Sequence, residues 1–121
     1  MDAFAPLIER ALADPAIARL AARLGRGVVF ERDGIAYPVV HADSVDVTIA
    51  APADVWDAMT SALPRPGHQS IGAAQRSEPQ LRITAQPLVW AQALPMLERL
   101  IEAMRAAAHP LADTGPVFAL D

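Results

Sequence analysis

Apolar residues recur at every third or fourth position in the first part of the chain, which is the pattern of amphipathic helices. One such stripe covers Phe4–Leu12, and a second begins at Pro15 and continues to Leu24. Asp14 suits the N-cap of the second helix, because its side chain can accept a backbone N–H, and proline suits the first helical position. Gly25 and Gly27 then end this helix. The sequence therefore predicts two consecutive helices.

The repeat then changes to two, which is typical of half-buried strands. Alternating residues predict strands over 28–32, 35–41 and 45–49. Asp33-Gly34 favours a two-residue hairpin turn, since both positions need a positive φ. Such a turn predicts three facing pairs: Arg32 with Ile35, Phe30 with Tyr37, and Val28 with Val39. Pro38 then faces Val29 at a non-hydrogen-bonded position, so its missing N–H points away from the first strand. We therefore expect a bulge or weak pairing on the far side of Pro38.

The second half of the chain is divided by prolines. A helix is predicted from Pro52, with its inner side formed by Val55, Trp56, Met59 and Leu63. A short helix is predicted within 69–76 and a strand over 81–85. The longest helix is predicted over 87–108, with its stripe formed by Trp90, Leu94, Leu97, Ile101, Met104 and Ala108. Pro95 has no N–H to donate, so this helix should kink or restart near Leu94.

These elements follow the order ααβββα(α)βα. That order predicts an α+β fold, with helices covering a mainly antiparallel sheet of four to five strands. The chain has 121 residues, which suits one domain. We expect this single domain to span residues 1–108 and an irregular tail to follow over 109–121, where periodic apolar positions are missing.

Composition excludes several classes of function. The chain is 53% hydrophobic and has no cysteine, so we expect neither disulfides nor thiolate chemistry. Its net charge of -4 disfavours nucleic-acid binding. The basic residues are all arginine, which we interpret as the bias of a GC-rich bacterial genome. No secretory signal and no apolar run of membrane-spanning length is seen, so we expect a cytoplasmic protein without a membrane span.

Catalytic constellations are not evident in the sequence. His41, His68 and His109 do not lie at metal-ligand spacing, so no metal, cofactor or catalytic residue is expected. His41 and His109 suit surface or capping positions. His68 lies in a loop after Pro66-Gly67 and is retained as a ligand-binding candidate.

One region resembles the sterol carrier protein type 2-like family, in a bacterial branch. The resemblance rests on Val45–Ile49 leading into Ala50–Trp56, on the Pro64–Gln69 loop, and on Leu81–Gln92 followed by Leu94–Glu102. Ala85-Gln86 departs from the Gly-Asp that the family usually has before its final helix. The resemblance implies a mixed sheet covered by helices around an apolar tunnel, which binds lipids without chemistry of its own.

We therefore expect a module that binds a lipid or other hydrophobic small molecule in an apolar cavity between the sheet and the helices. Transfer of that molecule is a further role that the resemblance implies. The candidate ligand-binding residues are Phe30, Val47, Ile49, Trp56, Met59, His68, Ile83, Trp90, Leu94 and Leu97. An alternative is a protein-interaction, dimerisation or enzyme-accessory module with a filled core. A third reading is a small enzyme that uses His68 or Asp57 as acid or base.

Overall fold

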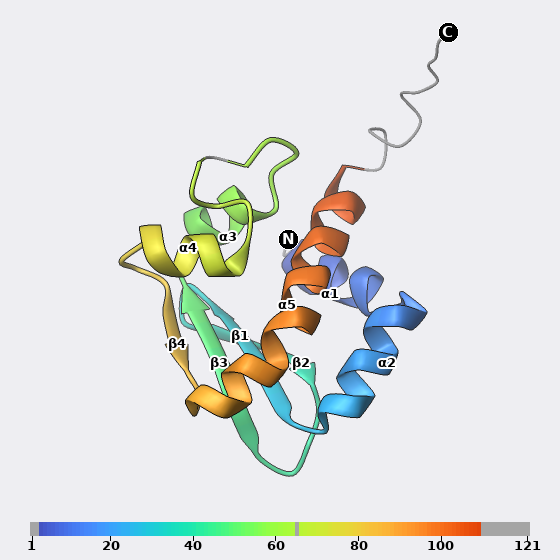
Figure 1. Cartoon of the computed structure of the whole chain (residues 1–121). Helices are drawn as coiled ribbons and strands as arrows, with labels where there is room; N and C mark the ends of the chain where they lie inside the picture. Colours follow the sequence, from blue (N-terminus) through green and yellow to red (C-terminus); the bar gives the residue numbers. More distant parts are fainter. Residues whose placement is uncertain (1–2, 65, 110–121) are drawn as a thin grey trace, which may run out of the picture.

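The computed structural model describes residues 3–64 and 66–109 and has the predicted order of elements (Figure 1). The predicted tail lies outside the described residues from residue 110 onward. The helices are α1 (Phe4–Leu12), α2 (Pro15–Leu24), α3 (Ala53–Met59), α4 (Ile71–Ser77) and α5 (Pro87–Ala108), and the strands are β1 (Gly27–Arg32), β2 (Ile35–Val40), β3 (Val45–Ala51) and β4 (Arg82–Thr84).

The sheet is mixed, so the prediction of a mainly antiparallel sheet is wrong. Its four strands lie in the order β2-β1-β3-β4, and β3 runs parallel to β1 while the other two pairings are antiparallel. β3 does not pair with β2 but lies on the other side of β1. Pro38 explains this in part, because it offers no N–H on the outer side of β2 and so suits an edge strand.

The β1–β2 hairpin forms at the predicted turn. Asp33 has φ 53° and Gly34 has φ 81°, as a two-residue turn of this hand requires. Phe30 pairs with Tyr37 and Pro38 with Val29, as predicted. The register shifts between Val28 and Val29, within the β1–β2 pairing and not on the far side of Pro38 where an irregularity was expected, so Val28 pairs with Val40 and not with Val39.

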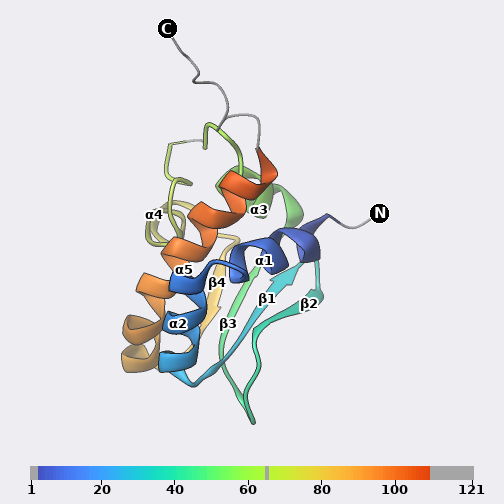
Figure 2. The ribbon, with the colours of Figure 1, turned by 90° about the vertical axis from the view of Figure 1, so that its right-hand side faces the viewer.

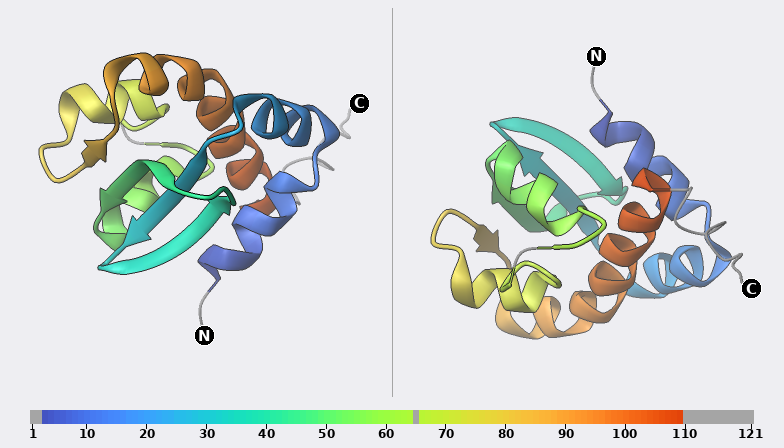
Figure 3. Two further views of the ribbon diagram at one scale, coloured as in Figure 1. Left: turned by 90° about the horizontal axis from the view of Figure 1, so that it is seen from below. Right: turned by 90° about the horizontal axis from the view of Figure 1, so that it is seen from above.

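Helices cover one face of the sheet and leave the other face open. Figure 2 and Figure 3 show α1, α2 and α5 in a layer on the covered face, while α3 and α4 lie at one end of the sheet. Side chains of alternate strand residues enter the core on the covered face; they include Val28, Phe30, Tyr37, Val39, Val47 and Ile49. The hydrophobic core therefore lies between the covered face of the sheet and the helices.

Helix α3 is shorter than predicted and ends at Met59. Leu63 was expected on its inner side, but it lies beyond the helix and is 88% exposed. Arg105 of α5 explains how the helix end is held, because its guanidinium donates to the Met59 carbonyl at 2.7 and 3.1 Å. Arg105 also donates to the Gln69 carbonyl at 3.0 Å, so α5 anchors both ends of the intervening loop.

Helix α5 is continuous from Pro87 to Ala108 and does not restart at Pro95. Figure 3 shows that its axis is curved, as expected where a proline removes one helical hydrogen bond. Its fully buried stripe runs through Ala93, Leu97 and Leu100, so Trp90 and Leu94 lie at the margin of the stripe. Within the described residues, no helix combines the length and apolar character that crossing a membrane requires.

Candidate functional site

Most of the predicted ligand-binding residues form the packed core. Six of the ten expose none of their surface: Phe30, Val47, Ile49, Trp56, Met59 and Leu97. A side chain that lined a void of water size or larger would expose some surface to that void. The space between sheet and helices is therefore occupied by these side chains. A guest molecule there would have to displace them.

Trp56 illustrates how tightly this space is filled. Its ring centroid lies 4.7 Å from that of Phe30 and 5.1 Å from that of Phe4. Its indole N–H donates to the Glu31 carbonyl at 3.0 Å, which satisfies the polar atom of a fully buried side chain. Phe4 continues the aromatic cluster to Tyr37, at 5.0 Å in an edge-to-face arrangement. The ring that was expected to line a cavity is enclosed by other rings.

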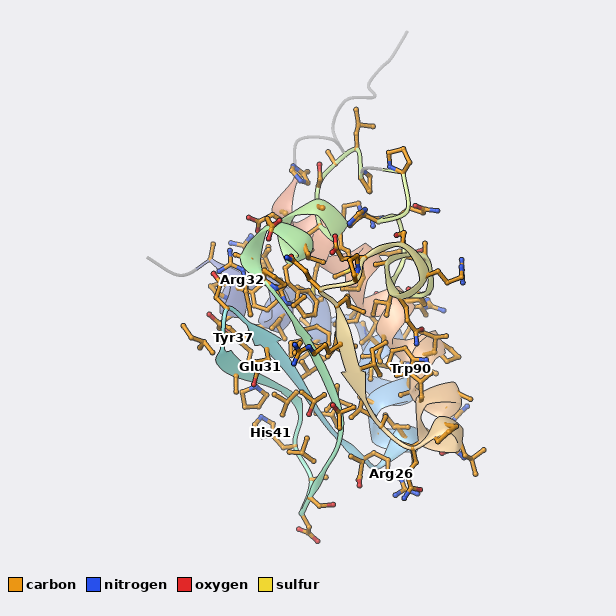
Figure 4. The ribbon with its side chains drawn as sticks, turned by 90° about the vertical axis from the view of Figure 1, so that its left-hand side faces the viewer. Arg26, Glu31, Arg32, Tyr37, His41 and Trp90 are labelled. Carbon is orange, nitrogen blue, oxygen red and sulfur yellow. The ribbon has the colours of Figure 1, made fainter. Side chains whose placement is uncertain are left out.

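The remaining predicted residues do not converge with this set on one open site. Ile83, Trp90 and Leu94 are partly buried and pack against the edge of the core. Figure 4 shows Trp90 on the β4 side of the sheet. His68 is buried in the loop between α3 and α4, where its Nε2 lies 3.4 Å from Glu78 Oε2 and its Nδ1 lies 3.4 Å from the Pro66 carbonyl. Its polar partners indicate a role in holding this loop.

The residues considered for acid–base or metal chemistry are also dispersed. Asp57 is exposed on α3 and lies 3.4 Å from the guanidinium of Arg32. His109 caps α5, and its Nε2 lies 3.2 Å from the Thr60 carbonyl. Among the described residues, no group of three or more histidine, aspartate or glutamate side chains is placed to hold a metal ion.

A mainly apolar hollow on the surface lies between α2 and α5, and we call it the α2/α5 groove. It has a volume of about 430 Å³. Leu20 and Leu24 of α2 and Pro95 and Met96 of α5 supply its apolar lining, and Arg23, Arg26 and Gln92 supply its polar groups. The volume of the groove is within the usual range for small-molecule sites, and its lining is typical of them, since such sites are mostly apolar with a few polar groups.

The sequence did not predict this groove, although it predicted both helices that form it. Leu20 and Leu24 belong to the predicted stripe of α2, and Pro95 was recognised as an interruption of α5. The available signal is that Leu20, Leu24 and Pro95 are apolar residues on two predicted helices. Which helix lies beside α2 is a tertiary property, and the stripe alone does not give it.

Other hollows lie on the sheet side of the molecule. One, of about 260 Å³, lies between α1 and the edge strand β2 and is lined by residues that include Ile8, Leu12, Tyr37 and His41. Another, of about 420 Å³, lies where β1, β3 and β4 approach the Asp33-Gly34 turn, and it contains Glu31 and Arg82. This second hollow is more polar than the α2/α5 groove, and its lining includes the charged residues Glu31, Asp33 and Arg82.

Comparison with known proteins identifies no relative of this chain. The chain matches no family model, no curated protein and no solved structure. The resemblance to the sterol carrier protein type 2-like family therefore stays a prediction. The structure itself shows an α+β fold with a four-stranded mixed sheet and helices on one face.

Proposed function

We propose that this protein binds a small hydrophobic molecule in the α2/α5 groove. The observation that carries the proposal is the groove itself: an apolar hollow of about 430 Å³ between two helices, next to a core that has no free space around its largest side chains. Binding is non-covalent, and the ligand moves from water onto the side chains of Leu20, Leu24, Pro95 and Met96. The function retains the hydrophobe binding expected from the sequence and changes its location.

The physical driving force predicts how affinity depends on the ligand. Each methylene group buried in the groove contributes about 0.8 kcal/mol, which corresponds to about a fourfold gain in affinity. This gain continues until the groove is full and then stops. A series of unbranched alcohols from hexanol to dodecanol should therefore bind with increasing affinity up to a chain length set by the groove.

Isothermal titration calorimetry of the alcohol series tests the proposal. Leu20→Glu places a carboxylate in the groove and should reduce decanol affinity at least tenfold, because binding would then take this charged group out of water. Leu88→Glu is the matched control, since Leu88 is a 70% exposed leucine on α5 that does not line the groove. The proposal fails if decanol does not bind, or if both variants bind it as the unsubstituted chain does.

A further inference from the structure

The open face of the sheet carries an acid and a base on one cross-strand row. Glu31 of β1 pairs with Ala50 of β3, and Ala50 pairs with Arg82 of β4. The preceding row, Phe30, Ile49 and Ile83, belongs to the core or packs against it. Because side chains alternate between the faces of a sheet, Glu31, Ala50 and Arg82 project from the uncovered face. Figure 4 views this face, with Glu31 labelled on it.

This row forms the floor of the hollow of about 420 Å³ beside the Asp33-Gly34 turn. Ala50 lies between two long side chains and has only a methyl group, so it leaves space above the strand. The rim comes from three connecting segments: the Asp33-Gly34 turn, Ala51-Pro52 after β3, and Pro79-Gln80 before β4. The hollow is thus a shallow cup with a carboxylate on one side and a guanidinium on the other.

The two charges of the row do not neutralise each other. In residues 3–64 and 66–109, the ion pairs are Arg26–Asp46, Arg32–Asp57 and His68–Glu78, and neither Glu31 nor Arg82 takes part in them. Two strand spacings separate these residues, which places their Cα atoms about 10 Å apart. The third charge at the hollow, Asp33, accepts the Ala53 N–H at 2.8 Å and so holds the start of α3.

We propose that this hollow binds a short zwitterion, with a carboxylate on Arg82 and an ammonium group on Glu31. Arginine presents paired donors that match a carboxylate, and a carboxylate accepts strongly from an ammonium group. The Cα atoms of Glu31 and Arg82 lie about 10 Å apart, and their long, flexible side chains can lean towards each other above Ala50. A short ω-amino acid such as β-alanine, with two carbons between its charged groups, can therefore bridge the two side chains.

This site is independent of the α2/α5 groove. The groove lies between two helices of the layer on the covered face, whereas the hollow lies on the uncovered face. Substitutions at Glu31 and Arg82 leave the packed core untouched. Failure at one site therefore does not imply failure at the other.

Titration with β-alanine, followed through backbone amide NMR shifts, tests the proposal. The amides of Glu31, Ala50 and Arg82 should shift in a saturable way. Propionate and propylammonium each carry only one of the two charges and should bind at least tenfold more weakly, since each loses a charged hydrogen bond. The proposal is overturned if β-alanine causes no saturable shift, or if propionate produces the same shifts at the same concentrations.

Variants make the test specific to the two charges. Glu31→Gln and Arg82→Gln should each weaken β-alanine binding about tenfold or more, whereas Glu9→Gln and Arg76→Gln, at exposed positions outside the hollow, should leave it unchanged. Exchanging the charges in the double variant Glu31→Arg/Arg82→Glu should restore binding, because the zwitterion can turn around. A folded double variant that does not bind, or shifts that depend on protein concentration as face-to-face pairing of two chains would produce, would refute the assignment.

Discussion

Replacing Leu97 by alanine measures directly how full the interior is. Leu97 lies on α5 with no exposed surface, in the same cluster as Ile49 and Trp56. The substitution removes three buried carbon atoms, which costs about 2.4 kcal/mol in lost transfer free energy. A cavity that persists adds about 24 cal/mol per Å³, so a residual volume of about 65 Å³ adds about 1.6 kcal/mol. We therefore expect a loss of about 4 kcal/mol in the free energy of unfolding.

Urea denaturation followed by circular dichroism measures this loss. With an m value of about 2 kcal/mol per M, the unfolding midpoint should fall by about 2 M. Leu88→Ala makes the same chemical change on the same helix at a 70% exposed position and should change stability by less than about 0.5 kcal/mol. If an existing ligand-sized void already adjoined Leu97, the substitution would only enlarge it. A measured cost below about 2 kcal/mol would refute the filled core.

Two further predictions concern the loop between α3 and α4 and the edge of the sheet. Glu98 of α5 accepts the N–H groups of Ile71 and Gly72, at the start of α4, at 2.7 and 3.1 Å. Glu98→Ala should therefore lower the free energy of unfolding by about 1.5–3 kcal/mol and accelerate hydrogen exchange at both amides. Unchanged exchange would show that these bonds do not hold α4. Pro38 removes a donor from the outer side of the edge strand β2. Pro38→Thr should therefore increase self-association in sedimentation velocity experiments, whereas equal sedimentation of both proteins would show that this proline does not protect the edge.

Local features of the fold were predictable because their causes lie within a few residues. Asp14 accepts the Ala16 N–H at 2.8 Å and Gly25 has φ 62°, so the ends of α2 follow from the residues at those ends. The turn at Asp33-Gly34 follows in the same way from two residues that tolerate positive φ. In these places, the sequence and the structure agree because no distant contact competes.

The position of β3 could not be predicted from the same kind of information. Alternation in 45–49 identifies a strand and its buried face but does not say which strand it pairs with. Gly27 is informative in retrospect, since a Cβ at this position would clash with the Ser44 carbonyl where β3 begins beside β1. Glycine there permits the close approach that the parallel pairing requires.

The candidate sites were harder still to predict from the sequence, because both are formed by residues that lie far apart in the chain. Apolar residues of the core were correctly placed inside, but an inward-facing residue fills space as readily as it lines it. Trp56 is an example: its helical position predicted burial, and only its ring contacts show that no room remains. The hollow between Glu31 and Arg82 requires the β1-β3-β4 register, in which β1 pairs with β3 and not only with the next strand along the chain, β2.

Methionine methyl groups provide the most direct test of where a hydrophobic ligand binds. Met96 lines the floor of the α2/α5 groove, although it exposes only 2% of its surface, whereas Met59 and Met104 expose none and do not line the groove. With ¹³C-methyl-methionine label and added decanol, the Met96 signal should shift in a saturable way while the Met59 and Met104 signals stay in place. Saturable shifts of Met59 or Met104 with an unmoved Met96 signal would mean that the ligand enters the core, and would contradict binding at the groove.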